Sequence, residues 1–128
     1  MTALGTTEVA SAPNNEPLKE LMTVQDNSLL TLTQVIGKSE LLTEIEIVAH
    51  KYSISANKSI QVAKCESSFN QNARGSAGEI GLYQFKINTW NWFNSLRKTN
   101  LDINNIHHQV SMYAWAIANG YSSHWSCY

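Results

Sequence analysis

One apolar face repeats at helical spacing in the segment that follows residue 38. Its positions are i, i+4, i+7, i+8 and i+11, occupied by Leu41, Ile45, Val48, Ala49 and Tyr52. This spacing predicts a helix over roughly 39–53. No alternating pattern typical of a strand competes with helix anywhere in the chain, so the sequence indicates a predominantly all-α fold.

Further helices are expected downstream. Ser55 is a suitable N-cap for a second helix that runs to about Phe69. A third helix is expected to begin near residue 88 or 89, after a loop that contains three glycines. Asp102 or Asn104 would cap a last helix, for which Gly120 is a natural stop.

The distribution of charge suggests two parts. The 128 residues have a net charge of -1, but residues 1–37 carry four acids and one base (-3), whereas residues 38–128 carry six acids and eight bases (+2). We expect residues 1–37 to be a flexible acidic tail or linker, although a weak apolar pattern in 16–37 also fits a short docking helix. Residues 38–128 would then form one small domain.

Several function classes are disfavoured. A nearly neutral chain lacks the basic patch that nucleic-acid binding requires, and no apolar run is long enough to cross a membrane. The first residues lack the basic and apolar regions of a signal peptide, so none is visible in this chain. His107 and His108 diverge on a helix, and with His124 they match no zinc-ligand spacing, so neither metal nor cofactor is expected.

Glu66 is the acid whose surroundings favour chemistry. It would lie near a helix C-terminus between Cys65 and Phe69, where desolvation and the helix dipole disfavour the ionised form and raise the pKa. A protonated carboxyl can donate to the leaving oxygen of a glycosidic bond, and Tyr83 and Gln84 offer an aromatic face and an amide to a sugar. The alternative is a solvated surface glutamate.

The string from Glu66 to Phe85, ESSFNQNARGSAGEIGLYQF, resembles without a gap the pattern E-S-x-F-N-P-x-A-x-S-x-x-G-x-x-G-L-x-Q of the soluble lytic transglycosylase domain. The resemblance extends from about residue 39 to the C-terminus. The matching positions are Glu66, Ser67, Phe69, Asn70, Ala73, Gly78, Gly81, Leu82 and Gln84.

The resemblance implies a lysozyme-like α domain that cleaves the β-1,4 bond between N-acetylmuramic acid and N-acetylglucosamine in peptidoglycan. In this family a single glutamate, here Glu66, first protonates the leaving oxygen and then deprotonates the muramic C6 hydroxyl, which closes a 1,6-anhydro ring. A second carboxylate is unnecessary, unlike in most glycosidases. The resemblance further implies a monomer in an extracellular, cell-wall or periplasmic location.

The resemblance also assigns substrate contacts, with some departures. Gln84 matches a glycan-binding glutamine and Ser67 matches the small polar residue after the acid. Gly75 stands where a substrate-contacting serine is common, and the adjacent Ser76 could replace it. Tyr113 is the candidate for the tyrosine that orients the acid, with a core aromatic as the alternative.

Glu79 departs from the small residue that is usual in the family. If its side chain faces the cleft, it could position a water opposite Glu66 and convert the reaction to hydrolysis, as in a lysozyme; otherwise it is a solvated loop residue. A non-catalytic glycan-binding module is the third functional alternative.

The C-terminal sequence resembles the W-x-C ending of secreted relatives that also carry a cysteine before the catalytic glutamate. This implies a disulfide between Cys65 and Cys127, beside Glu66, in an oxidising compartment. Two buried free thiols are the alternative.

Overall fold

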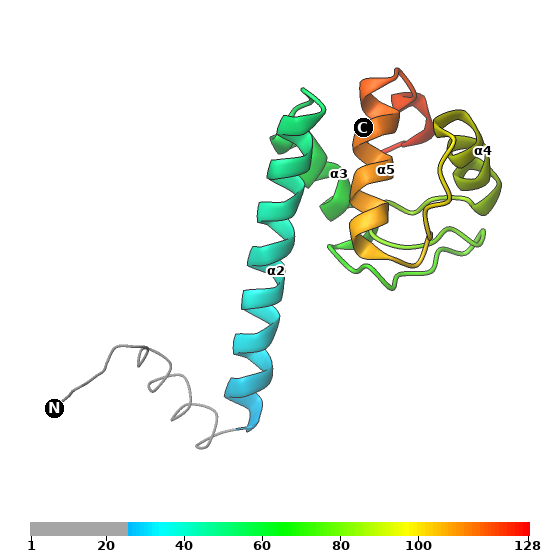
Figure 1. Ribbon diagram of the computed structural model, residues 1–128. Helices are drawn as coiled ribbons and strands as arrows, with labels where there is room; N and C mark the ends of the chain where they lie inside the picture. The colour runs from blue at the N-terminus through cyan, green and yellow to red at the C-terminus, as the bar shows by residue number, and fades with distance from the viewer. Residues whose placement is uncertain (1–25) are drawn as a thin grey trace, which may run out of the picture. The chain divides into compact units, whose positions relative to one another are not determined.

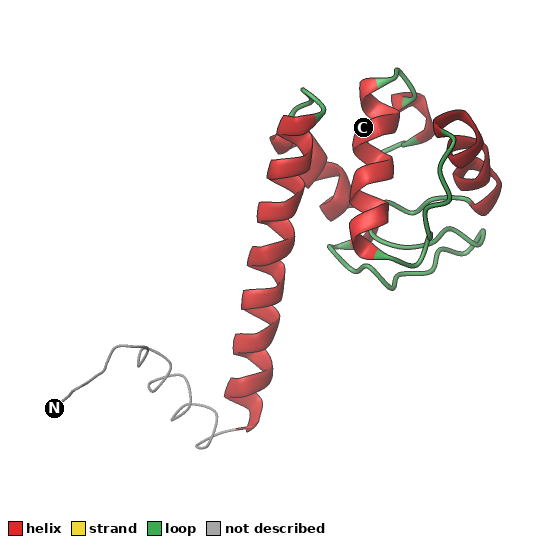
Figure 2. Cartoon of the chain, in the orientation of Figure 1, coloured by secondary structure: helices red, strands yellow, loops and turns green. Residues whose placement is uncertain are grey.

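The computed structural model describes residues 26–128, with side chains from residue 37 onward. Residues 40–128 form one compact unit, which contains the candidate site. The described residues form helices without a named strand, which confirms the all-α class (Figures 1 and 2). The elements are α2 (Asp26–Lys51), α3 (Ala56–Ser67), α4 (Ile87–Arg97), α5 (Ile106–Ala118) and the 3-10 helix η2 (Ser122–His124).

Helix α2 begins at Asp26, well before the expected start near residue 39. No proline lies between Asp26 and Lys51, and the one glycine, Gly37, weakens a helix without ending it. Residues 26–37 are therefore helical, as the docking-helix interpretation allowed. The rest of the predicted tail lies outside the described residues, and the division at residue 37 stays a prediction.

Helix α3 begins as expected and ends two residues early. The Ser55 side chain accepts a hydrogen bond from the Lys58 N–H at 3.0 Å, which confirms the N-cap. After Ser67 the backbone turns left-handed at Ser68 (φ 53°) and again at Phe69 (φ 65°). This reversal directs the chain into residues 70–85, called the glycine loop because they include Gly75, Gly78 and Gly81, instead of prolonging the helix to Phe69.

The cap of α5 is neither of the two predicted residues. Asn105 is the N-cap, and its Oδ1 accepts hydrogen bonds from the N–H groups of His107 (2.9 Å) and His108 (3.2 Å). Asp102 instead accepts from the Asn104 N–H and closes a turn one step upstream. The choice depended on where the chain turns, because all three side chains are competent caps.

An aromatic core joins α3, α4, α5 and residues 119–128, which are called the C-terminal tail. The rings of Tyr83 and Tyr113 stack with centroids 3.9 Å apart, and Trp125 packs edge-on against both Tyr113 and Phe85. In Figure 1, α5 lies between α3 and α4, and the glycine loop lies at the end where α5 begins. The core consists of Ile45, Val62, Ala63, Leu82, Tyr83, Phe85, Trp90, Phe93, Ile103, Val110, Met112, Tyr113, Ala116 and Trp125.

Gln109 fixes the glycine loop to α5. This side chain is fully buried, and its Oε1 accepts from the Leu82 N–H at 2.9 Å while its Nε2 donates to the Ile103 carbonyl at 2.8 Å. Gly81, with φ 87°, lies against the same amide, and a Cβ at Gly81 would come within 2.6 Å of it. The backbone can approach this closely only because residue 81 has no side chain.

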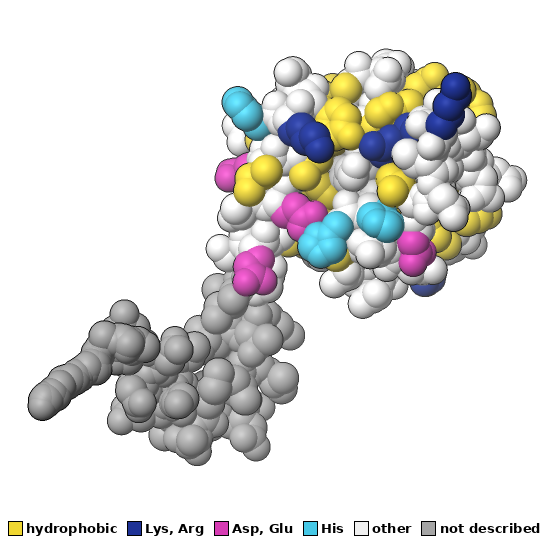
Figure 3. Space-filling model, viewed as in Figure 1, with side chains coloured by type: hydrophobic (Ala, Val, Ile, Leu, Met, Phe, Trp, Pro, Cys, Tyr) yellow, Lys and Arg dark blue, Asp and Glu magenta, His cyan; other side chains and the backbone are white. Residues whose placement is uncertain are grey.

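On the surface, charges of both signs are interspersed with apolar side chains. Figure 3 shows lysines and arginines mostly across the upper part of one face, with acidic side chains and histidines below them and also along the upper left edge. A contact between α2 and α5 involves such groups, because the His107 Nδ1 lies 2.8 Å from the Glu44 carboxylate. The pair is partly exposed, so its contribution to stability is small.

Candidate active site

Glu66 lies in the last turn of α3 and lines a cavity of about 640 Å³. Three segments that are distant in the sequence form the walls: the glycine loop, the start of α4 and the C-terminal tail. A cavity of this volume is typical of sites that hold small ligands or a section of a polymer. The lining residues are Glu66, Gly75, Ser76, Glu79, Gln84, Phe85, Lys86, Thr89, Ser123, His124, Trp125 and Ser126.

The pKa of the Glu66 carboxyl is raised, as the sequence predicted. Partial burial is the main cause, because it removes water from the ionised form, and the negative charge of Glu79 adds to the rise. A hydrogen bond from the backbone of Cys127 opposes both effects. The net result favours the protonated carboxyl, which is the form that a general acid needs.

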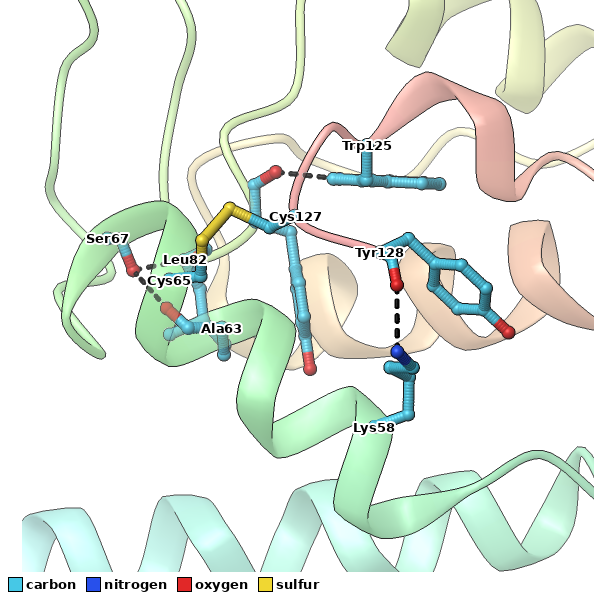
Figure 4. Close-up of a disulfide and its surroundings, with 9 residues drawn as sticks. Lys58, Ala63, Cys65, Ser67, Leu82, Trp125, Cys127 and Tyr128 are labelled. Atoms are coloured by element: carbon cyan, nitrogen blue, oxygen red, sulfur yellow. Dashed lines mark hydrogen bonds between the residues drawn. A yellow bond between two sulfur atoms is a disulfide. The ribbon is translucent and has the colours of Figure 1, made fainter.

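The Cys65–Cys127 disulfide is present and brings the tail to the acid. Its Cα atoms lie 6.0 Å apart and it joins positions 62 residues apart. Figure 4 shows the tail held against α3 by this bond and, further along, by the Lys58 ammonium, which donates to the Tyr128 carbonyl at 2.8 Å. The disulfide therefore places the Cys127 N–H beside the residue that follows Cys65.

Trp125 anchors the tail from the other side. Its indole Nε1–H donates to the Tyr83 carbonyl at 2.8 Å, and only 5% of the residue is exposed. Its ring packs against the core while the residue also borders the cavity. The tail thus acts as a fixed wall of the site, because it is held by a covalent bond, a buried hydrogen bond and aromatic packing.

The glycine loop presents an amide and a carboxylate to the cavity. The Gln84 Nε2 donates to the carbonyls of Gly81 (2.9 Å) and Ala73 (3.3 Å), which directs its Oε1 towards Gly75. The Glu79 Oε1 accepts from the Ala77 N–H at 3.1 Å and lies over the same glycine. Gln84 and Glu79 therefore share one wall of the cavity.

Gly75 and Glu79, two departures from the family pattern, are sterically related. A Cβ at Gly75 would collide with the Glu79 carboxylate and approach the Gln84 Oε1 at 2.7 Å. The carboxylate of Glu79 thus occupies the space that a serine side chain at position 75 would need. Glu79 is half-buried and lines the cavity, which fits the cleft-facing alternative, and its part in the reaction stays a prediction.

Other predicted contact residues separate into two groups. Ser76 lines the cavity and is exposed. Ser67 and Tyr83 do not line it: the Ser67 hydroxyl donates to the Leu82 carbonyl at 2.7 Å, and the Tyr83 hydroxyl donates to the Ser59 carbonyl at 3.0 Å. Because these hydroxyls hold the fold together, the geometry assigns Ser67 and Tyr83 a structural role.

Tyr113 is also a core residue. Only 1% of Tyr113 is exposed. Among the described residues its hydroxyl has no hydrogen-bond partner at ordinary geometry, and Glu66 is no exception. Burial raises the pKa of Tyr113, and the charge of Glu66 is the smallest of the causes acting on it. The burial of the ring fits the core alternative, and the acid-orienting role of Tyr113 stays a prediction.

Sequence reasoning missed five residues that line the cavity. Lys86 and Thr89 come from the start of α4, and Ser123, His124 and Ser126 come from the tail. The likeness of the tail to a W-x-C ending was the available signal, because a disulfide to Cys65 already required the tail to pass Glu66. Nothing in the local sequence indicated which side chains would face inward.

Among the described residues, no cluster of three or more histidines, cysteines or acids could hold a metal ion. Across residues 26–128, none of the helices combines the length and the apolar character that a membrane span requires.

A protein-family model matches most of the part of the chain that forms this site. The family model described as Transglycosylase SLT domain matches residues 44–123, more than half of the chain. Comparisons with curated proteins and with solved structures gave no match. The family model implies a glycan-cleaving class of enzyme with peptidoglycan as substrate, and therefore a location outside the cytoplasm, where a disulfide also fits. The matched range includes Glu66 and the whole glycine loop, so the chain belongs to the transglycosylase SLT domain family.

Proposed function

We propose that the protein is a lytic transglycosylase that cleaves the β-1,4 bond between N-acetylmuramic acid and N-acetylglucosamine, with Glu66 as both acid and base. The observation that carries the proposal is the position of Glu66. Its carboxyl lines the cavity with a raised pKa, and it occupies the family's acid position in an uninterrupted motif.

The reaction would proceed in two proton transfers. Protonated Glu66 gives its proton to the bridging oxygen as the bond to the muramic C1 breaks, and the substrate's acetamido group stabilises the cationic carbon. The Glu66 carboxylate then removes the proton of the C6 hydroxyl, whose oxygen bonds to C1 and closes the 1,6-anhydro ring. Glu66 ends protonated, as it began, and no water is consumed.

The arrangement around Glu66 supports both of its roles. Desolvation and the Glu79 charge favour the acid form, whereas the Cys127 backbone hydrogen bond stabilises the carboxylate that must form midway. The net rise in the pKa of Glu66 brings its acid and base forms closer in free energy at neutral pH, which suits a residue that alternates between them. Gln84 and Ser76, on the same cavity, would bind the glycan.

Mass spectrometry of digested peptidoglycan tests the reaction. A transglycosylase releases products that end in 1,6-anhydro-muramic acid, which are lighter by one water than reducing ends. The Glu66→Gln variant should lose activity by at least about a hundredfold, because the amide cannot transfer a proton. Cleavage by this variant at the parent rate would contradict the assignment of Glu66.

A hydrolase is the second candidate, and Glu79 is the observation that favours it. Its carboxylate lines the same cavity and acts on Glu66 electrostatically. In two-carboxylate glycosidases the second carboxylate activates a water or stabilises the cationic carbon. Reducing ends among the products, lost in a Glu79→Gln variant, would select the hydrolase over the transglycosylase.

A non-catalytic glycan-binding module makes a different prediction. Such a module would leave peptidoglycan uncut, and Glu66→Gln would retain the parent's affinity for glycan with no activity to lose. A direct comparison of binding and cleavage in the parent and in this variant therefore separates the module from both enzymes.

A further inference from the structure

We propose that Trp92 forms an outer sugar-binding subsite, which holds the glycan strand where it leaves the cavity that contains Glu66. The inference rests on the proposed function, since a polymeric substrate must extend past a cavity that encloses only part of it. It assigns a binding role to a residue that neither the catalytic motif nor the cavity lining includes.

Two contacts place Trp92 at the edge of the cavity. On α4, Thr89 lines the cavity, and Trp92 follows three residues later on the same helical face. On the tail, His124 lines the cavity, and its ring centroid lies 5.9 Å from that of Trp92. Trp92 is therefore adjacent to a cavity-lining residue on each of two walls, α4 and the tail.

The indole is exposed in a way that core packing does not explain. Trp92 is 44% exposed, whereas Trp90 and Trp125 are 1% and 5% exposed. A large aromatic side chain left in water costs hydrophobic free energy unless a ligand covers it. Because Trp92 packs against His124, which lines the cavity, the ligand of that cavity is the natural occupant.

Neighbouring rings hold the indole in place. Tyr121 packs edge-on against Trp92 with centroids 5.2 Å apart, and Phe93 lies 5.4 Å away on the same helix. A platform held in this way loses little side-chain entropy when a ligand binds. The apolar C–H face of a pyranose ring can stack on such an indole, and its hydroxyls remain in water.

The chemistry of the subsite is that of a stacking surface. The ring contacts of Trp92 are to Phe93, Tyr121 and His124. Stacking depends on the face of the sugar and not on its substituents, so the subsite would hold the strand without reading its peptide side branches.

Binding measured as a function of glycan length tests the proposal. Calorimetry would compare a disaccharide with an octasaccharide of alternating N-acetylglucosamine and N-acetylmuramic acid, using Glu66→Gln protein so that neither glycan is cut. Adding Trp92→Ala should weaken octasaccharide binding by about three- to tenfold and leave disaccharide binding unchanged. Trp92→Phe should restore part of the loss, because it keeps a stacking ring.

Leu96→Ala is the matched control, since Leu96 is 45% exposed on the same helix, one turn beyond Trp92. It should leave both affinities at the parent values. Equal weakening by Trp92→Ala and Leu96→Ala, or an octasaccharide affinity that Trp92→Ala does not change, would overturn the subsite. Either result leaves the Glu66 proposal standing, because that proposal is judged by cleavage products.

Discussion

Replacing Gly81 by alanine tests how the glycine loop is held against α5. Two costs are expected at this position. The first is backbone strain, since Gly81 has φ 87°, a conformation that L-residues rarely adopt. The second is steric, because the new Cβ would lie 2.6 Å from the amide of Gln109, whose side chain is fully buried in a close-packed interior.

The structure allows the two costs to be weighed separately. Positive φ costs an alanine about 1 to 2 kcal/mol. Displacing the Gln109 amide endangers two buried hydrogen bonds, to Leu82 and Ile103, and each buried group left unsatisfied costs about 1 to 3 kcal/mol. We therefore expect Gly81→Ala to lower the free energy of unfolding by roughly 3 to 5 kcal/mol, of which the steric part is the larger.

Gly78→Ala is the matched control. Gly78 has φ 86°, nearly the same as Gly81, but an added Cβ there meets nothing within 4 Å. It should therefore lose only about 1 to 2 kcal/mol, the strain alone. Urea denaturation followed by tryptophan fluorescence would measure both variants, and the thermal midpoints should fall in the same order.

A double-mutant cycle decides whether Gln109 is the cause. In a Gln109→Ala background the obstruction is gone, so the further effect of Gly81→Ala should shrink to that of Gly78→Ala. Equal losses for the two glycine variants in the parent protein would refute the steric reasoning. An undiminished effect of Gly81→Ala in the Gln109→Ala background would refute it as well.

Three further changes concern the acid and its neighbours. Cys127→Ser should lower the free energy of unfolding by about 4 kcal/mol in chemical denaturation, because it opens a loop that spans 62 residues. Glu79→Gln should move the alkaline limb of the activity profile to lower pH, because it removes a charge that raises the pKa of Glu66. Because the pKa of Glu66 is raised in the folded protein, Glu66 contributes its full stabilisation when the pH is below the ordinary pKa of a glutamate. This stabilisation is lost as the pH rises through the raised pKa. Glu66→Gln lacks this loss, so its stability relative to the parent should increase over that interval in denaturation at a series of pH values.

The disulfide has a role beyond stability in this arrangement. Cys65 precedes the acid directly, and its partner Cys127 supplies the backbone hydrogen bond that opposes the rise in the pKa of Glu66. The cysteine pair therefore both joins the tail to α3 and affects the pKa of Glu66. The tail also contributes His124 to the cavity, and His124 contacts Trp92. The disulfide that holds the tail at Glu66 therefore also holds a neighbour of the proposed subsite.

Local sequence was sufficient where one signal acted alone. The Ser55 cap needed only a side-chain oxygen and the backbone of the next turn, so it could be predicted without the fold. At the start of α5, by contrast, Asp102, Asn104 and Asn105 are all suitable N-caps. Asn105 is the cap because Asp102 closes a turn just before the helix. The early start of α2 was obscured because its apolar pattern is weak there, although no residue interrupts the helix.

From the sequence alone came the all-α class, the proposal of Glu66 as the acid and, through the family resemblance, the cysteine pair, because these depend on residue types at fixed spacing. The tertiary structure decided which side chains meet at the acid. It turned Tyr83 and Tyr113 into the core, where their rings stack, and it brought Glu79 into the cavity over Gly75. The physical reason is that burial and contact are set by segments far apart in the chain, which converge only when the tail, the glycine loop and α4 pack around the same space.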